Sequence, residues 1–225
     1  LGIMLFERTS VQNTVTVPAQ DDGQRQSMLM PIEPEAVDIE HGDLALYPVI
    51  FWTIDPGQPM PSDDAIKNLN HYMRNGGMLV FDTREKSTTG RGAVWLQRLV
   101  DRGLMIGALA EVKGCTKSNA DCHVLGKSLY LMDSFPGRYS GGKIWVEKAP
   151  AVDKDRVSPV VIGGNEWVAA WATDEDGRYL YAVAGDEEQR DHAFRFGINL
   201  VMYALTGNYK ADMLHVPAIL KRLAP

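Results

Sequence analysis

The segment 71–82 constrains the fold of this chain more than any other. Its first part ends a helical pattern, and Gly76 and Gly77 then permit the left-handed backbone that closes a helix. Residues 78–81 (Met-Leu-Val-Phe) are uniformly apolar, which is typical of a strand covered on both faces. Asp82 follows this strand directly. Because ligands bind at the carboxyl ends of strands in open α/β sheets, Asp82 marks the edge where a site is expected.

The residues before this segment complete a β-α-β unit. A strand is predicted over Leu46–Phe51, where the chain is rich in apolar and aromatic residues. Ser62 is a typical helix N-cap, and Asp63 and Asp64 follow it in the first turn, where the helix dipole favours acids. The helix is predicted over residues 63–75. The crossover is expected to be right-handed, with its two strands parallel.

The rest of the chain is predicted to alternate short elements with turn-rich loops. Further strands are predicted over residues 143–147, 158–162, 167–172 and 179–183, and further helices over 93–102 and 189–205. Residues 163–165 and 174–177 are typical of hairpin turns. The last helix is apolar on nearly every face, so it should be buried, and Gly207 and Asn208 predict its end. The predicted fold class is a three-layer, Rossmann-like α/β domain with a mostly parallel sheet, helices on both faces and added β-hairpins.

The first forty residues carry little pattern. Leu1–Arg8 has the apolar spacing of an amphipathic helix, and we expect Ile3 and Leu5 or Phe6 to pack against the sheet. Residues 21–34 mix Asp, Gly, Gln and Pro and predict a loop. The chain begins with leucine rather than methionine. We therefore expect one domain over residues 1–225 that forms the C-terminal part of a longer protein.

The composition argues against several classes of function. The 225 residues carry a formal net charge of -6 and contain no basic cluster, so nucleic acid is not an expected partner. The longest apolar runs are far shorter than the ~20 residues that a membrane-spanning helix needs. We therefore expect that the domain itself does not span a membrane. No cofactor-binding motif is found, and no cofactor is predicted.

Cys115 and Cys122 are the two cysteines of the chain, and both lie in a polar loop. A zinc site needs further ligands, and His123 alone does not complete the set, so no metal is predicted. A catalytic thiol needs a sharp turn or a helix start around it, which this loop lacks. Two interpretations remain, a local disulfide in an oxidising compartment or two free thiols. Because a loop of this length readily brings its ends together, we expect the two Cα atoms within about 7 Å.

Polar residues outside the apolar segments supply the candidate catalytic groups. Asp82 is a candidate general base or ligand-binding carboxylate, or else it caps the turn at residues 83–86. His123, beside Asp121, is a candidate acid–base catalyst, or else a histidine of a surface loop. Arg138 can bind an anion through its guanidinium group, or else pair with a local acid and stiffen a glycine-rich loop.

Further residues are candidates for binding. Asn165 and Glu166 either line a pocket or form the tip of a hairpin. The polar loop 83–92 is typical of a ligand-covering segment and equally of a mobile surface loop. The predicted binding residues are Asp82, Thr83, Arg138, Asn165 and Glu166.

Three segments of the chain resemble a known family. They are residues 135–139 (Phe-Pro-Gly-Arg-Tyr), 144–147 (Ile-Trp-Val-Glu) and 195–210, and they are similar to the DUF4159 family. Residues 44–82 and 171–185 resemble the class I glutamine amidotransferase-like fold, close to its trehalose-utilisation (ThuA-like) branch. Members of DUF4159 often form the C-terminal domain of large bacterial membrane proteins with aerotolerance-type N-terminal regions. The resemblance therefore implies a soluble domain of a bacterial protein that is anchored in the inner membrane.

The resemblance also bears on mechanism. Amidotransferases carry a nucleophilic cysteine after the strand that matches residues 78–81, and here Asp82 and Thr83 hold that place, which excludes a Cys-His-Glu mechanism. We expect a non-catalytic binding or interaction domain whose partner is an unknown protein or a small polar ligand. The alternative is a hydrolase or isomerase of a small polar substrate, carbohydrates included, that uses Asp82 with His123 or Arg138. An enzyme should gather these three residues in one concave pocket, whereas an interaction domain should scatter them or fill that pocket.

Overall fold

The chain divides into two compact units, residues 1–36 and 37–225. The computed structural model describes in full residues 36–86, 89–116, 122–148, 157–174 and 176–205, and describes the backbone of 14–18, 25–29 and 206–223. The helix predicted over Leu1–Arg8 lies outside the described residues. The expectation of a single domain stays a prediction.

The first unit contains a pair of strands. β1 (Thr14–Pro18) and β2 (Arg25–Leu29) are antiparallel. β2 lies inside the segment 21–34, so the prediction of a loop there is wrong over residues 25–29. The polar side chains of that segment suggested a loop, but main-chain pairing with β1 decides the conformation.

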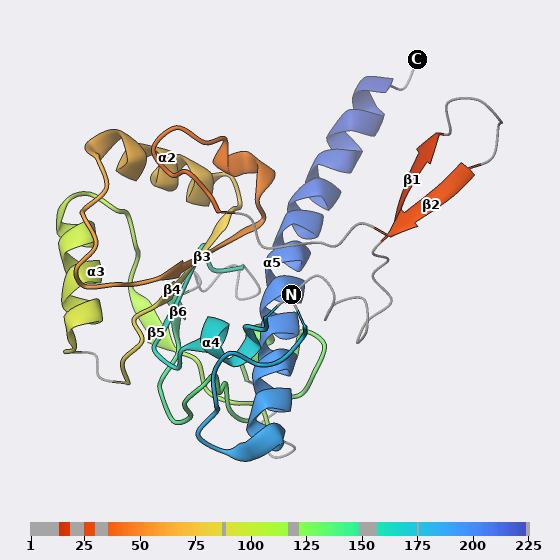
Figure 1. Ribbon diagram of the computed structural model, residues 1–225. Helices are drawn as coiled ribbons and strands as arrows, with labels where there is room; N and C mark the ends of the chain where they lie inside the picture. Colours follow the sequence, from red (N-terminus) through yellow and green to blue (C-terminus); the bar gives the residue numbers. More distant parts are fainter. Residues whose placement is uncertain are drawn as a thin grey trace. The chain divides into compact units, whose positions relative to one another are not determined.

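A five-stranded sheet forms the centre of the second unit (Figure 1). Its strands are, in order across the sheet, β3 (Val49–Thr53), β4 (Met78–Asp82), β7 (Val160–Gly163), β6 (Trp145–Glu147) and β5 (Leu109–Glu111). β3 and β7 both pair with β4 in parallel, β6 is antiparallel to β7, and β5 is antiparallel to β6. All strands except β6 therefore run in one direction, and the α/β fold with a mostly parallel open sheet is confirmed.

β4 lies between two hydrophobic clusters. Leu79 and Phe81 belong to a cluster with residues of α2 (Asp63–Arg74) and α3 (Arg91–Asp101). Met78 and Val80 belong to the other cluster, with residues of α4 (Trp167–Trp171) and α5 (Asp186–Leu223). Side chains of a strand alternate between its faces, so a uniformly apolar strand needs cover on both. The prediction that residues 78–81 form a buried central strand is confirmed.

The β-α-β unit forms as the sequence predicts. Ser62 caps α2, and its hydroxyl oxygen accepts a hydrogen bond from the Ala65 amide at 3.0 Å. The helix ends at Arg74, and Gly76 then has a φ angle of 95°, which confirms the glycine stop. The first part of the predicted strand Leu46–Phe51 is different, because a 3-10 turn, η1 (Leu44–Leu46), precedes β3.

Two predicted strands are wrong. Residues 167–172 form the short helix α4 and not a strand, so residues 163–165 connect a strand to a helix and are not a hairpin turn. Within the described part of residues 179–183, Tyr179 makes an isolated bridge with Thr173 but no strand follows. Both segments have the aromatic and β-branched residues of strands, but tertiary contacts override that propensity.

α5 extends further than predicted. The helix continues through Gly207 and Asn208, which were expected to end it. Glycine lowers helix propensity by about 1 kcal/mol but ends a helix only where it turns left-handed. Phe196, Ile198 and Leu200 are fully buried, which confirms the predicted burial of residues 189–205. Among the described residues, no helix combines the length and the hydropathy that crossing a membrane requires.

Cys115 and Cys122 form a disulfide. Their Cα atoms are 5.1 Å apart, as expected for a loop whose ends meet. A second 3-10 turn, η2 (Val124–Gly126), follows directly. Both cysteines are buried, so the disulfide belongs to the packed core and not to the protein surface.

Candidate functional site

The predicted binding residues meet at the carboxyl edge of β4 and β7. Asp82 ends β4 and pairs with Gly163, the last residue of β7. Thr83 follows β4, whereas Asn165 and Glu166 follow β7 and lead into α4. This edge is the place where open α/β sheets bind ligands.

The Asp82 carboxylate joins three parts of the chain. One oxygen, Oδ1, accepts hydrogen bonds from the amides of Arg84 at 2.9 Å and Glu166 at 3.4 Å. The other, Oδ2, accepts from the amide of Trp167 at 2.7 Å. Burial raises the pKa of Asp82, and the three amide bonds oppose that shift. The side chain therefore ties β4 and its following turn to the start of α4.

Arg84 and Glu166 both have backbone conformations that are uncommon for residues other than glycine. Their φ angles are 58° and 52°, in the left-handed region. Arg84 Nε lies 3.6 Å from one Glu166 oxygen, and Arg138 Nη1 lies 3.1 Å from the other. The Glu166 side chain is 11% exposed, so its charge is largely buried between two guanidinium groups.

Arg138 is fully engaged within the protein. Besides Glu166, it contacts the carbonyl oxygen of Ala182, to which Nε donates at 3.2 Å. Its guanidinium group also lies 5.3 Å from the ring centre of Tyr139 and 5.4 Å from that of Tyr181. Of the two roles considered for Arg138, the contacts are those of a residue that pairs with a local acid.

Asn165 and Thr83 hold neighbouring loops. Asn165 is 1% exposed, and its amide group donates to the carbonyl of Phe135 at 2.9 Å and accepts from the amide of Gly142 at 3.0 Å. The Thr83 hydroxyl lies 3.1 Å from the carbonyl oxygen of Gly163. Asn165 thus fixes the loop that carries Arg138, and Thr83 fixes the end of β7.

His123 lies away from this group. Its Nδ1 accepts from the Leu125 amide at 3.2 Å, and its ring packs edge-on against Tyr203 at 5.4 Å. The Tyr203 hydroxyl in turn accepts from the amide of Ser158, just before β7 begins. His123 is therefore near the amino end of β7, whereas Asp82 is at the carboxyl end. Burial lowers the pKa of His123. The structure does not bring Asp82 and His123 together, and Asp121 lies outside the described residues.

A cavity of about 390 Å³ opens at the same carboxyl edge. Thr83, Gly163 and Gly164 form its end beside the Asp82 network. Its other described walls are Glu85, Lys86, Ala93, Leu96, Gln97, Val100, Ile106, Gly107, Leu109, Lys143, Trp145 and Ile162. The volume lies in the range of small-molecule sites, ~300–1,000 Å³. We refer to this space as the carboxyl-edge cavity.

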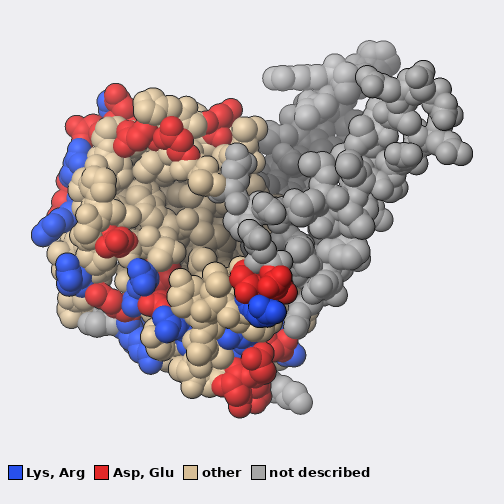
Figure 2. Space-filling model, viewed as in Figure 1, with Lys and Arg blue, Asp and Glu red and all other residues tan. Residues whose placement is uncertain are grey.

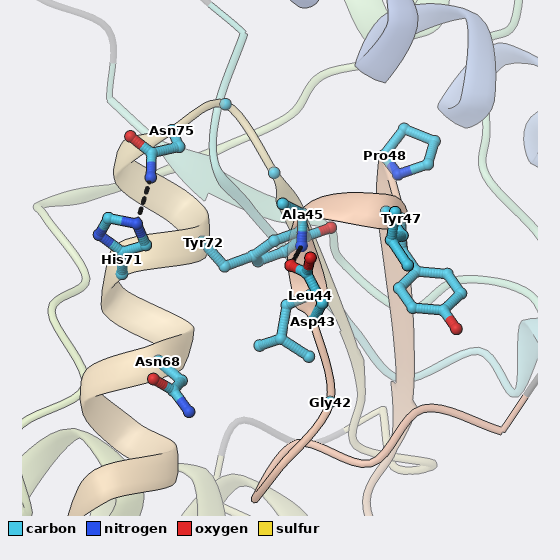
Figure 3. A pocket seen from close by; sticks show the side chains of 13 residues that line it. Gly42, Asp43, Leu44, Ala45, Tyr47, Pro48, Asn68, His71, Tyr72 and Asn75 are labelled. Atoms are coloured by element: carbon cyan, nitrogen blue, oxygen red, sulfur yellow. Dashed lines mark hydrogen bonds between the residues drawn. The ribbon is translucent and has the colours of Figure 1, made fainter.

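A second cavity, of about 360 Å³, lies at the amino ends of β3 and β4 (Figure 3). Its polar side chains are already hydrogen-bonded: Asn75 Nδ2 contacts His71 Nε2 at 2.8 Å, and Asp43 accepts from the Ala45 amide at 3.1 Å. None of the predicted site residues lines it. It lies at the edge opposite the one where α/β sheets bind ligands, so the carboxyl-edge cavity is the stronger candidate.

Charge and metal-ligand patterns add little to the site. On the face seen in Figure 2, the described Lys and Arg side chains alternate with Asp and Glu, without a continuous basic patch. Within the described ranges, no cluster of three or more His, Cys, Asp or Glu side chains has the geometry to hold a metal ion. The chemistry of the site therefore rests on its cavity and its ionic network.

The sequence analysis missed the far wall of the cavity. Lys143 and Trp145 were assigned to a strand and not to a site, and the apolar side of α3 was assigned to the core. Leu96 and Val100, four residues apart on α3, were the available signal, because that spacing puts them on one helix face. Which neighbour that face meets depends on the antiparallel placement of β6.

Comparison with known proteins places the chain in a family. Among curated proteins, none matches this chain. A family model described as "Domain of unknown function (DUF4159)" matches residues 19–205, a range that contains both the Asp82 network and the carboxyl-edge cavity. The match spans most of the sequence. The chain therefore belongs to the DUF4159 family.

Proposed function

We propose that this chain is a non-catalytic binding domain with a glutamine amidotransferase-like (ThuA-like) fold, which binds a small ligand or a protein partner at the carboxyl edge of its sheet. The observation that carries the proposal is the state of Asp82. This residue stands where an amidotransferase carries its nucleophile, and it is 1% exposed with both oxygens hydrogen-bonded to backbone amides.

A catalytic carboxylate must reach a substrate proton or carbon atom. Asp82 accepts three amide hydrogen bonds from its own chain, which leaves no open face toward the cavity. The cysteines are joined in a disulfide, so they supply no thiolate. His123 is at the other end of the sheet. These contacts favour binding over the alternative of hydrolase or isomerase chemistry.

The fold assignment and the cellular setting are part of the same proposal. The two hydrophobic clusters, one with α2 and α3 and the other with α4 and α5, support a three-layer Rossmann-like arrangement around the sheet. We place the domain in a bacterial protein anchored in the inner membrane, because members of the DUF4159 family often have that architecture.

Turnover assays test the proposal. The purified chain and its Asp82→Asn variant are assayed against panels of amides, esters and glycosides, with the melting temperature of each protein recorded in parallel. We expect no turnover above background from either protein. Turnover by the wild type that disappears in a folded Asp82→Asn variant would contradict the proposal and support the hydrolase or isomerase alternative.

A further inference from the structure

The carboxyl-edge cavity has apolar walls and a cationic rim. We propose that it binds a small amphipathic anion, a molecule with a compact apolar body and a carboxylate or phosphate head. This inference rests on the proposed binding function and names the class of ligand for that site.

The walls supply the apolar contacts. Leu96 and Val100 come from α3, Ile106 and Leu109 from the segment that follows it, and Trp145 from the start of β6. Leu109 remains 43% exposed, and Trp145 is partly exposed. Apolar surface that folding leaves uncovered in a concave site gains free energy when a ligand covers it.

The rim supplies the charge. Among the described residues, no carboxylate forms an ion pair with Lys86, whose Nζ lies 5.8 Å from the centre of the Tyr139 ring. Lys143 also lines the rim, but its Nζ contacts Glu111 at 2.7 Å. Lys86 is therefore the cation on the described rim that is available to an anionic head, which a charge-assisted hydrogen bond would hold.

Glu85 is the acid in the described lining, and its orientation limits its effect on an anion. Its Oε2 accepts a hydrogen bond from the amide of Gly92, at the start of α3, at 3.1 Å. The helix dipole stabilises a negative charge at that position. Lys86 and Lys143 together outnumber this acid at the rim, so the charge there favours an anion over a cation.

Calorimetric titration with matched amphiphiles tests the inference. Decanoate, decyl phosphate and decyltrimethylammonium have the same apolar chain and differ in the head, and each is titrated below its micellar concentration. We expect saturable binding of at least one anion, with the cation bound at least about tenfold more weakly. The anion that binds identifies the head group, since the two anions are separate arms of the experiment.

Two pairs of variants locate the binding. Val100→Phe fills the cavity and should weaken anion binding at least about tenfold, whereas Val94→Phe, on the 46%-exposed side of the same helix, should not. Lys86→Glu changes only a surface charge and should also weaken anion binding. The exposed Lys113→Glu, outside the cavity, is its control. Lys86→Glu keeps the test decisive if Val100→Phe fails to fold.

The possible results separate this inference from the proposed function. Equal binding of anion and cation, no anion binding, or anion binding that survives both Val100→Phe and Lys86→Glu would overturn the inference and leave a non-catalytic binding domain standing. Turnover in the amide, ester and glycoside assays would instead overturn the proposed function.

Discussion

Asp82 shows how one buried side chain can serve three backbone segments. The amides of Glu166 and Trp167 lie at the start of α4, where a helix has no internal acceptors for its N–H groups. The amide of Arg84 belongs to the turn after β4. A carboxylate with two acceptor oxygens and no donor suits this position, because every neighbour it faces is a donor.

We predict that Asp82→Asn lowers the free energy of unfolding by about 1–3 kcal/mol. Asparagine replaces one acceptor oxygen with an NH₂ group, which then faces a backbone N–H that has lost its partner. Urea denaturation measures the change. Asp55→Asn is the matched control, since Asp55 also accepts a backbone amide, from Gly57, but is exposed. An equal effect at both positions would contradict the special role of Asp82.

The raised pKa of Asp82 predicts a pH dependence. The folded state binds the Asp82 proton more tightly than the unfolded state does, because burial raises the pKa above its ordinary value of 3.8. Ionisation therefore costs the folded state free energy as the pH rises from about 3.8 through the folded pKa. We expect the stability advantage of the wild type over Asp82→Asn to narrow across that interval. Denaturation of both proteins at several pH values checks this, and an advantage that widens with pH would show a lowered pKa instead.

Secondary structure was predictable where local signals decide it. The Ser62 cap, the Gly76 stop and the uniformly apolar β4 each depend on neighbours in sequence, and all three were found. α4 depends on Asp82, which is 85 residues away from Trp167 in sequence. No window around residues 167–172 contains that information, so their strand-like composition was misleading.

The connection between β7 and α4 requires glycine at position 164. A Cβ atom there would lie 1.8 Å from the carbonyl oxygen of Glu85, a backbone atom that cannot rotate away. We therefore predict that Gly164→Ala destabilises the domain by about 3 kcal/mol or more. Gly57→Ala is the control, because the atom nearest to its Cβ is 3.4 Å away. Thermal and urea denaturation of both variants test the prediction, which fails if they unfold alike.

The disulfide closes a short loop in the packed core. Loop-closure entropy predicts that the Cys115–Cys122 bond contributes about 2–3 kcal/mol to the free energy of unfolding. The comparison is urea denaturation of the oxidised and the fully reduced protein. A Cys115→Ser/Cys122→Ser double variant should not respond to reductant and controls for other effects. Identical midpoints for oxidised and reduced wild type would refute the contribution.

At the scale of the whole sheet, the site lies where strand direction changes. β7 and β6 are antiparallel, and Trp145 at the start of β6 pairs with Ile162 near the end of β7. The amino end of β6 thus brings Trp145 and Lys143 to the edge that Asp82 marks. The edge itself was predictable from Asp82 alone. The cavity was not, because it depends on the direction of β6 and on the side of the sheet that α3 covers.

The separation between the Asp82 network and the cavity walls has a consequence for divergence within the family. The carboxylate and the amides that anchor α4 lie on one side of this edge, whereas Leu96 and Val100 on α3 face the cavity. Mutations on that face of α3 can alter what the domain recognises without disturbing its anchoring contacts. Selection can therefore act on ligand preference and on foldability independently, which lets relatives acquire new ligands while they retain one scaffold.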